Sequence, residues 1–431
     1  MRWGFSVTTR AEWLGHAIQS VRPEVRPTSA PWCAPVAGVH AAAAIETTPA
    51  HARQRREKVT HWDEPRRRAV TAPELSRFER HPHVVPMPTR ESFRGCLLGG
   101  AIGDALGAPV EFMSRAEIHK RYGEQGIERF DVAYGRHGAI TDDTQMTMFT
   151  AEGLLQALSL RQRRNDDRPQ AVVHRAYLRW LSTQHTGEVG SSATETSGWL
   201  IGVRALHACR APGMTCVTAL SGGRMGRPGY PLNGSKGCGG VMRIAPCALV
   251  KEWDPYTLGC DVAAITHGHQ SGYLAAGALA VIIRAVLEGH SVAQGVSAAL
   301  VRLVPEPGGA ECIDALRHAT TLRKGYYLKG DVEKLGLGWV AEEALAIGVY
   351  AAMVGEMDLQ KGLTVAVNHS GDSDSTGAIA GNILGVIHGE EALSRLSLGD
   401  VELRDELIRL ADDLFDAWTD QPGWAERYCA K

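Results

Sequence analysis

Regularly spaced glycines constrain the fold of this chain more than any other feature. Two segments place glycine at every fourth position: Gly95, Gly99, Gly103 and Gly107 in GCLLGGAIGDALG, and Gly377, Gly381, Gly385 and Gly389 in GAIAGNILGVIHG. A glycine inside a helix costs about 1 kcal/mol relative to alanine, so several on one face must serve a purpose. This spacing aligns them on one ridge, against which another backbone can pack closely. We therefore expect two central helices of one bundle.

The alternative is that the two segments are loops with accidental spacing. A membrane helix pair is disfavoured because both segments are short and polar at their ends. The longest apolar run, near 275–287, contains Arg284 and is too short to span a bilayer. The first twenty residues lack a continuous apolar stretch of the secretory type. We expect no membrane association.

From residue 91 onward the sequence has a helical period. DDTQMTMFTAEGLLQAL places apolar residues at helical spacing after two acids, and Asp254-Pro255 predicts a cap and first turn. VAEEALAIGVYAAMVG predicts a helix that ends at a glycine C-cap, and DVELRDELIRLADDLFDAW predicts an amphipathic closing helix. Few runs alternate like strands, so we expect an all-α fold of roughly a dozen helices.

Composition changes near residue 90. Residues 1–90 contain ten of the 20 prolines, with 14 Arg and Lys against eight Asp and Glu, which gives this part a net charge of +6 in a chain of net charge −2. We expect a flexible extension over 1–90 and one folded domain over 91–425. A misassigned start and an arm for an acidic partner are the other interpretations. We do not expect nucleic acid, because no aromatic stacking pattern accompanies the basic residues.

Cysteine usage indicates the compartment. The chain has nine cysteines, an odd number, and no CxxC pair. This pattern argues against a disulfide framework or a zinc site and favours a reducing cytoplasm.

Two acidic clusters carry the chemistry. Each cluster stands at the expected start of a helix and has hydroxyl side chains beside its acids. The first is Thr141, Asp142 and Asp143 in AITDDTQMT, and the second is Asp372, Asp374 and Ser375 in NHSGDSDSTGAIAG. Helix capping alone would explain one acid in each cluster, but not two. Closely spaced carboxylates need cations, and an all-oxygen ligand set suits Mg²⁺ or Mn²⁺. The pattern favours a two-metal site.

DSDST also matches the D-x-D-x-T signature of haloacid-dehalogenase phosphatases. There, the first aspartate ends a buried strand early in an α/β domain. Here, the motif lies late in the chain, before a helix and without strand–helix alternation. We therefore disfavour this interpretation.

Five ordered motifs now carry a family resemblance: GCLLGGAIGDALGAPVEF, ITDDTQMT, NGSKGCGGVMRIAP, ITHGHQSGYLAAGAL and NHSGDSDSTGAIAGNILG. Over about residues 91–425 the chain resembles the ADP-ribosylglycohydrolases, which include dinitrogenase-reductase-activating glycohydrolase and ADP-ribosylarginine hydrolases. The resemblance implies an all-α fold with two Mg²⁺ ions, or Mn²⁺ in their place. It implies two ligand sets: Thr141, Asp142 and Asp143, and Asp372, Asp374 and Ser375. Relatives commonly have threonine where this chain has Ser375, which keeps the hydroxyl.

The resemblance also implies catalytic and supporting carboxylates. Glu111, in GAPVEF, matches a glutamate near the scissile bond of some relatives, and we expect it and Asp143 to serve catalysis. The alternative for Glu111 is a solvated charge at a helix end. Asp104 fits support behind the metal ligands or a buried structural role equally well.

The glycine-rich SKGCGGVMR is expected to open a helix whose free N–H groups bind a pyrophosphate. We assign the substrate-binding role to Lys236, Gly237, Gly239, Gly240 and His267. Surface solvation is the alternative for Lys236 and Arg243, and a satisfied core histidine is the alternative for His267.

The function implied by the resemblance is Mg²⁺-dependent removal of ADP-ribose from arginine side chains of modified proteins. Alternatives are hydrolysis of serine-linked or polymeric ADP-ribose, hydrolysis of a small ADP-ribose derivative, and a non-catalytic ADP-ribose-binding protein. Some relatives act as immunity proteins against ADP-ribosylating toxins. The long basic extension resembles that plan, so we hypothesise that residues 1–90 bind the NAD-binding cleft of a cognate ADP-ribosyltransferase toxin.

Overall fold

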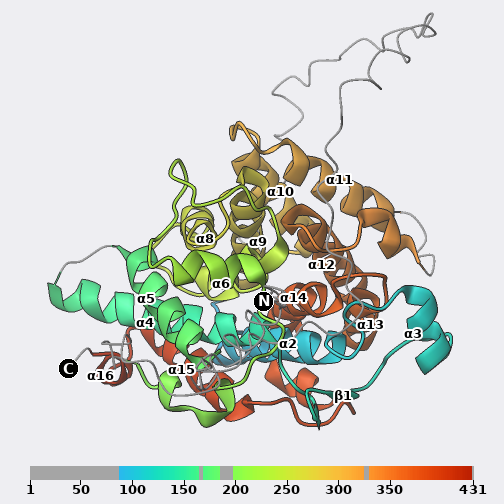
Figure 1. Cartoon of the computed structure of the whole chain (residues 1–431), viewed down its shortest axis with the longest axis horizontal. Coiled ribbons are helices and arrows are strands. Elements are labelled where there is room, and N and C mark those ends of the chain that lie inside the picture. Colours follow the sequence, from blue (N-terminus) through green and yellow to red (C-terminus); the bar gives the residue numbers. More distant parts are fainter. Residues whose placement is uncertain (1–86, 165–167, 185–197, 325–329, 430–431) are drawn as a thin grey trace, which may run out of the picture.

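The structure is a computed structural model that describes residues 87–164, 168–184, 198–324 and 330–429. The expected extension lies outside the described residues up to residue 86. Within the described ranges, the chain forms fifteen α-helices and one two-stranded antiparallel hairpin, which confirms the all-α prediction (Figure 1). The count is somewhat higher than expected because short helices such as α7 and α16 have no periodic sequence signal.

The helices in chain order are α2 (Arg90–Gly107), α3 (Arg115–Tyr122), α4 (Asp142–Arg164), α5 (Pro169–Thr183), α6 (Met214–Ser221), α7 (Ala245–Ala248), α8 (Pro255–Ala264), α9 (Gln270–Leu287), α10 (Val292–Leu303), α11 (Ala310–Lys324), α12 (Ala341–Gly355), α13 (Leu359–Val367), α14 (Ser373–Ser394), α15 (Arg404–Trp418) and α16 (Trp424–Arg427). The strands are β1 (Val132–Ala133) and β2 (Arg136–His137), in which Val132 is opposite His137. Short 3₁₀ turns are η3 (Leu200–Gly202), η4 (Arg204–Leu206), η5 (Cys238–Gly240) and η6 (Asp331–Leu335).

The two glycine-rich helices, α2 and α14, pack against each other at the centre of the bundle (Figure 1). Their glycines meet reciprocally. A Cβ atom added at Gly99 would lie less than 3.0 Å from the carbonyl oxygen of Gly381, and one at Gly381 would lie as close to that of Gly99. Gly95 and Gly385 face each other in the same way. Real Cβ atoms essentially never approach so closely, so only glycine permits this backbone contact.

Two details of the glycine prediction were wrong. Gly389 still contacts α2, because a Cβ atom added at Gly95 would lie 3.0 Å from its Cα, but its φ of 74° places it in a kink and not in continuous helix. Gly355 is the last residue of α12 rather than its cap, which is Glu356. The predicted cap at Asp254 is confirmed: its carboxylate accepts a hydrogen bond of 2.9 Å from the backbone N–H of Thr257, and Pro255 begins α8.

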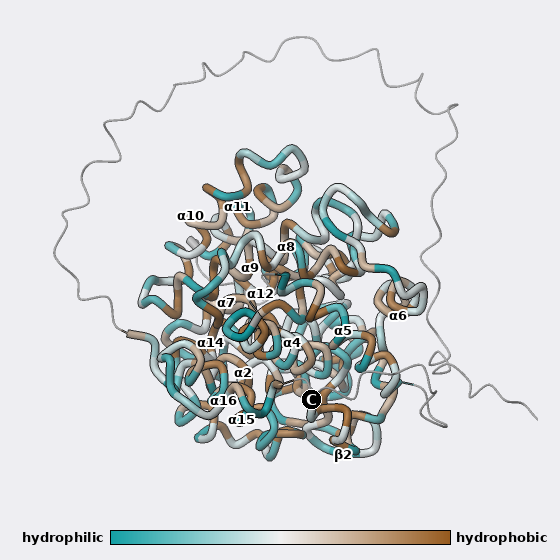
Figure 2. The backbone as a smooth tube through the Cα atoms, turned by 90° about the vertical axis from the view of Figure 1, so that its left-hand side faces the viewer, coloured by the Kyte–Doolittle hydropathy of each residue, from teal (hydrophilic) through white to brown (hydrophobic). Residues whose placement is uncertain are grey.

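Helix α9 is long and apolar enough to cross a membrane by length and composition alone. Within the structure, 78% of its apolar window is buried. It packs against α8, α10 and α12 near the middle of the molecule (Figure 2). Its burial is therefore that of a core helix. Seven cysteines among the described residues are free.

We predict that Gly381→Ala destabilises the fold although alanine favours helix formation by about 1 kcal/mol. The added methyl group must push the backbone of α2 away, and overpacking of this kind typically costs about 1–3 kcal/mol. Chemical denaturation would measure the loss. Gly202→Ala is the matched control, because an added Cβ there has nothing within 4 Å. Equal stability of the Gly381→Ala variant and the wild type would contradict the close packing.

Candidate active site

The acidic site begins where the last turn of α2 touches the first turn of α14. A Cβ atom at Gly107 would collide with the carbonyl oxygen of Ser373 and the backbone nitrogen of Asp374. The chain then turns, and Glu111 follows four residues after the end of α2. One carboxylate oxygen from each of Glu111, Asp372 and Asp374 lies within 4.8 Å of the other two. The glycine contact thus brings three acids from distant parts of the sequence together.

Asp104 attaches the second acidic cluster to the same helix. Its fully buried carboxylate accepts hydrogen bonds from the backbone N–H groups of Thr141, at 3.0 and 3.1 Å, and Thr144, at 3.1 Å. The Thr144 hydroxyl donates a further bond of 2.5 Å. These bonds hold the start of α4 against α2. Asp104 thus combines the two roles left open for it: it holds two helices together, and it supports the acidic cluster from behind.

The acids of the second cluster are oriented but not fully paired. The Asp142 carboxylate accepts a 3.2 Å bond from the backbone N–H of Gly213. The backbone N–H of Asp143 donates to the Thr141 hydroxyl at 3.3 Å. Oδ2 of Asp143 is buried and has no hydrogen-bond partner in the part of the chain that the structure describes. A buried carboxylate oxygen without a partner is costly, so this atom points to a missing positive group.

Electrostatics link the two clusters. Burial raises the pKa values of Asp142, Asp143 and Asp374, and the charges of neighbouring carboxylates raise them further. Burial and the charges of Asp374 and Asp372 likewise raise the pKa of Glu111. Burial, with the charge of Asp374, raises the pKa of Asp104 to about 7. Burial and mutual repulsion therefore favour the protonated forms of these groups, whereas a bound cation would favour their charged forms.

No ion pair among the described residues includes any of these carboxyl groups. Arg210 lies near them, since its carbonyl oxygen accepts a bond of 3.1 Å from the backbone N–H of Asp142, but its guanidinium pairs with Glu402. The donor set is therefore rich in oxygen and lacks a protein cation. It fits divalent cations such as Mg²⁺ or Mn²⁺. Binding of such ions would release the retained protons.

Ser375 is buried beside this set, but its hydroxyl contacts sulfur. The nearest partners are Sγ of Cys238 at 3.7 Å and Sδ of Met242 at 3.8 Å. Thr376, the neighbouring hydroxyl, donates to the backbone carbonyl oxygen of Asp372 or Ala366, each at 2.8 Å, inside the fold. Of the two hydroxyls, Ser375 is therefore the one placed to serve a metal ion.

Sequence reasoning missed the part played by Cys238. Its thiol donates a hydrogen bond of 2.7 Å to Oδ2 of Asp372. Cys238 begins η5, so this bond attaches the glycine-rich turn directly to the acidic motif. No sequence signal could have found the contact, because 134 residues separate the two partners.

The glycine-rich turn lies against His267. Added Cβ atoms would come within 3.6 Å of the imidazole ring at Gly237, 3.0 Å at Gly239 and 3.5 Å at Gly240. The structure thus brings together four of the five residues predicted to bind substrate. The segment forms the 3₁₀ turn η5 instead of opening an α-helix, which corrects that expectation.

The charges near this turn differ from what the sequence suggested. The ammonium group of Lys236 already pairs with Glu342 and, at 3.1 Å, with Glu311. Arg243 is fully buried, so it is not a solvated surface residue; it donates to the Thr266 hydroxyl at 2.7 Å. Burial, with the charge of Arg243, lowers the pKa of His267 to about 3, so its ring is neutral at physiological pH.

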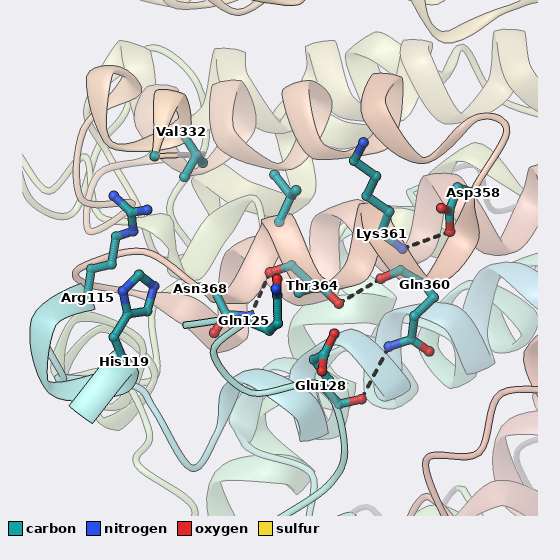
Figure 3. Close-up of a pocket in the computed structure, with 12 residues that line it drawn as sticks. Arg115, His119, Gln125, Glu128, Val332, Asp358, Gln360, Lys361, Thr364 and Asn368 are labelled. Atoms are coloured by element: carbon teal, nitrogen blue, oxygen red, sulfur yellow. Dashed lines mark hydrogen bonds between the residues drawn. The ribbon is translucent and has the colours of Figure 1, made fainter. Parts of the chain in front are cut away.

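A separate hollow of about 350 Å³ lies between α3, the segment after it and α13 (Figure 3). Its lining mixes charges of both signs: Arg115 and Lys361 are basic, and Glu128 and Asp358 are acidic. Asn368 closes its floor through bonds of 2.7 and 2.9 Å with the backbone of Ile127. The hollow contains none of the clustered acids.

A cluster of acids beside a glycine-rich turn in an all-α bundle is compatible with metal-ion catalysis. The family model for ADP-ribosylglycohydrolase matches residues 86–423, and the chain belongs to this family. This confirms the resemblance seen in the sequence.

Curated relatives agree with the family. An ADP-ribosyl-[dinitrogen reductase] glycohydrolase of Rhodospirillum rubrum is 24% identical over 74% of this chain and 94% of its own length. The ADP-ribosylarginine hydrolase Tri1 of Pseudomonas putida is 22% identical over 77% of this chain and 80% of its own. An uncharacterised protein of Archaeoglobus fulgidus is 29% identical over 68% of this chain and 87% of its own length. Family membership indicates an enzyme that hydrolyses an ADP-ribose linkage.

A solved structure described as an ADP-ribosylglycohydrolase-related protein complex has the same fold. It covers 76% of this chain and 98% of its own, with 24% identity and a TM-score of 0.52.

We predict that Mg²⁺ or Mn²⁺ raises the melting temperature of the wild type and that this rise disappears in Asp374→Asn. Without added metal, the variant should be at least as stable as the wild type, because one buried like charge is removed. Differential scanning fluorimetry with and without chelator would measure both effects. Cys238→Ala should keep most of the metal-induced rise, since hard cations do not need a thiol. An undiminished rise in Asp374→Asn would show that the ions bind elsewhere.

Proposed function

We propose that this chain is a Mg²⁺-dependent hydrolase that removes ADP-ribose from arginine side chains of modified proteins. The observation that carries the proposal is the cluster of buried carboxylates with no protein cation, in which Glu111, Asp372 and Asp374 lie within 4.8 Å of one another. One curated relative is named an ADP-ribosylarginine hydrolase, and a second is named a glycohydrolase of an ADP-ribosylated protein, dinitrogen reductase; these names support the choice of substrate. Mn²⁺ is the alternative ion.

Two sets of residues would hold the ions: Thr141, Asp142 and Asp143 on one side, and Asp372, Asp374 and Ser375 on the other. When bound, divalent ions would polarise ribose oxygens and lower the pKa of a water molecule. The protein contributes the orientation of these groups. Asp104 fixes the start of α4, Cys238 fixes Asp372, and the glycine contact fixes the start of α14.

Glu111 is the group best placed to move a proton. Its carboxyl shares a hydrogen bond with Asp374, and burial is the main cause of its raised pKa, which favours the protonated acid form. It would donate that proton to the departing guanidine or accept one from water. Asp143 carries the unpartnered buried oxygen and would stabilise positive charge on the ribose as the bond to C1″ breaks.

The glycine-rich turn would bind the pyrophosphate. Its three glycines allow the backbone to pack closely on the neutral ring of His267, which supports the turn from behind. Lys236 adds less direct charge than expected, because Glu311 and Glu342 already neutralise it.

The proposal extends to location and partner. A reducing cytoplasm fits the free cysteines, seven among the described residues. The basic extension would bind a cognate ADP-ribosyltransferase toxin, a hypothesis that rests on its charge alone. Deleting residues 1–85 should leave hydrolysis intact and weaken binding to such a toxin in a pull-down at low salt. Equal binding by the truncated chain would exclude the arm.

The linkage is tested by hydrolysis of arginine-linked and serine-linked ADP-ribosyl proteins, with release of ADP-ribose measured by chromatography. We expect rapid release from arginine, loss of activity with EDTA and recovery with Mg²⁺. Faster release from serine would favour the alternative linkage, and activity in EDTA would contradict the metal site.

The role of Glu111 is tested in the same assay. Glu111→Gln should lower kcat by about 10²–10⁴-fold, as expected for loss of a proton-transfer group, while metal binding persists. Glu391→Gln, on the exposed end of α14, is the control and should leave kcat unchanged. An unchanged kcat in Glu111→Gln would assign the proton transfer to another group.

A further inference from the structure

Strained backbone surrounds the acidic site. Five described residues other than glycine have positive φ, and three of them adjoin the clustered acids: Phe112 at 68°, Tyr134 at 49° and Ala211 at 52°. Phe112 directly follows Glu111, and the charges of Glu111 and Asp374, after burial, raise the pKa of Tyr134. Such conformations are unfavourable for side-chain-bearing residues and tend to persist at functional sites. The strain therefore points to a function for the side chains that it positions.

Phe112 stacks on an exposed tryptophan beside this site. Its ring and that of Trp339 have centroids 5.3 Å apart and planes inclined by 20°. Phe112 is 48% exposed and Trp339 is 37% exposed, which is unusual for large rings that touch each other. Because both rings remain exposed to solvent, burial of apolar surface does not explain why they are placed together.

The segment that carries Trp339 is tied to the acidic motif. The backbone N–H of Asp372 donates to the carbonyl oxygen of Leu337 at 2.8 Å, and that of Cys238 donates to the carbonyl oxygen of Trp339 at 3.1 Å. Phe112 is held on the opposite side by its neighbour Glu111. The aromatic pair thus stands at the rim of the acidic cluster, between Glu111 and the glycine-rich turn.

We propose that the Phe112–Trp339 pair is the platform on which the guanidinium group of ADP-ribosylated arginine stacks. This inference rests on the proposed function and names the part of the site that selects the linkage. A guanidinium is planar, delocalised and weakly hydrated, so it stacks on aromatic faces. An arginine keeps its positive charge when ADP-ribose is attached, whereas a serine linkage is neutral.

Adenine is the other flat group in the substrate that such a pair could stack. Glu111, which would act at the bond to arginine, directly precedes Phe112 in the chain. The position of the pair therefore favours the arginine end over the adenine end.

The test compares wild type, Trp339→Leu and Trp339→Phe with ADP-ribosyl-arginine as substrate. Trp339→Leu should raise KM about three- to thirtyfold, the range expected for loss of a cation–π contact, with a smaller change in kcat. Inhibition by free arginine should weaken by the same factor, while the Kd for ADP-ribose stays unchanged. Trp339→Phe keeps a ring and should restore most of the loss. Trp253→Leu, which removes a ring 5.7 Å from Arg161 outside the site, is the matched control.

The outcomes separate the inference from the proposed function. If the wild type cleaves arginine-linked ADP-ribose but Trp339→Leu leaves KM and arginine inhibition unchanged, the platform is wrong and the function stands. If Trp339→Leu and Trp339→Phe weaken ADP-ribose binding instead, the pair holds adenine and the platform is likewise wrong. If the wild type does not cleave the arginine linkage, both the proposed function and the aromatic platform are wrong. Circular dichroism of each variant verifies folding.

Discussion

The contact between the glycine faces of α2 and α14 positions everything else in the site. Because Gly99 and Gly381 face each other without side chains, the two backbones approach more closely than any other residue would allow. The contact continues to Gly107, which touches the first turn of α14. Glu111 follows in the turn after α2. Asp372 caps the start of α14, and Asp374 lies in its first turn. A packing rule therefore determines where the acids meet.

That meeting is electrostatically unfavourable unless positive charge is present. Burial and mutual repulsion raise the pKa values of Asp142, Asp143 and Asp374, and Oδ2 of Asp143 lacks a partner among the described residues. The fold supplies orientation through Asp104 but no counter-charge. We therefore expect such a site to bind divalent cations, and binding of these ions to the folded chain would also stabilise the bundle.

Much of this could be predicted from the sequence, for physical reasons. Both signals are local: glycines four residues apart indicate one face of a helix, and paired acids such as Asp372 and Asp374 predict a cation site. The contacts of Cys238, Trp339 and Arg243 could not be predicted, since each depends on segments that meet only in the folded chain. Gly389 was misassigned because spacing alone does not distinguish a glycine in continuous helix from one required by a kink with positive φ.

The central claim is that the acids gathered by the glycine contact bind divalent ions. The most direct test is to count Mn²⁺ bound to the full chain by electron paramagnetic resonance during titration near neutral pH. The account predicts two tightly bound ions per chain in the wild type. Binding of no ion, or of ions that remain when Asp142 and Asp372 are both replaced by asparagine, would contradict it.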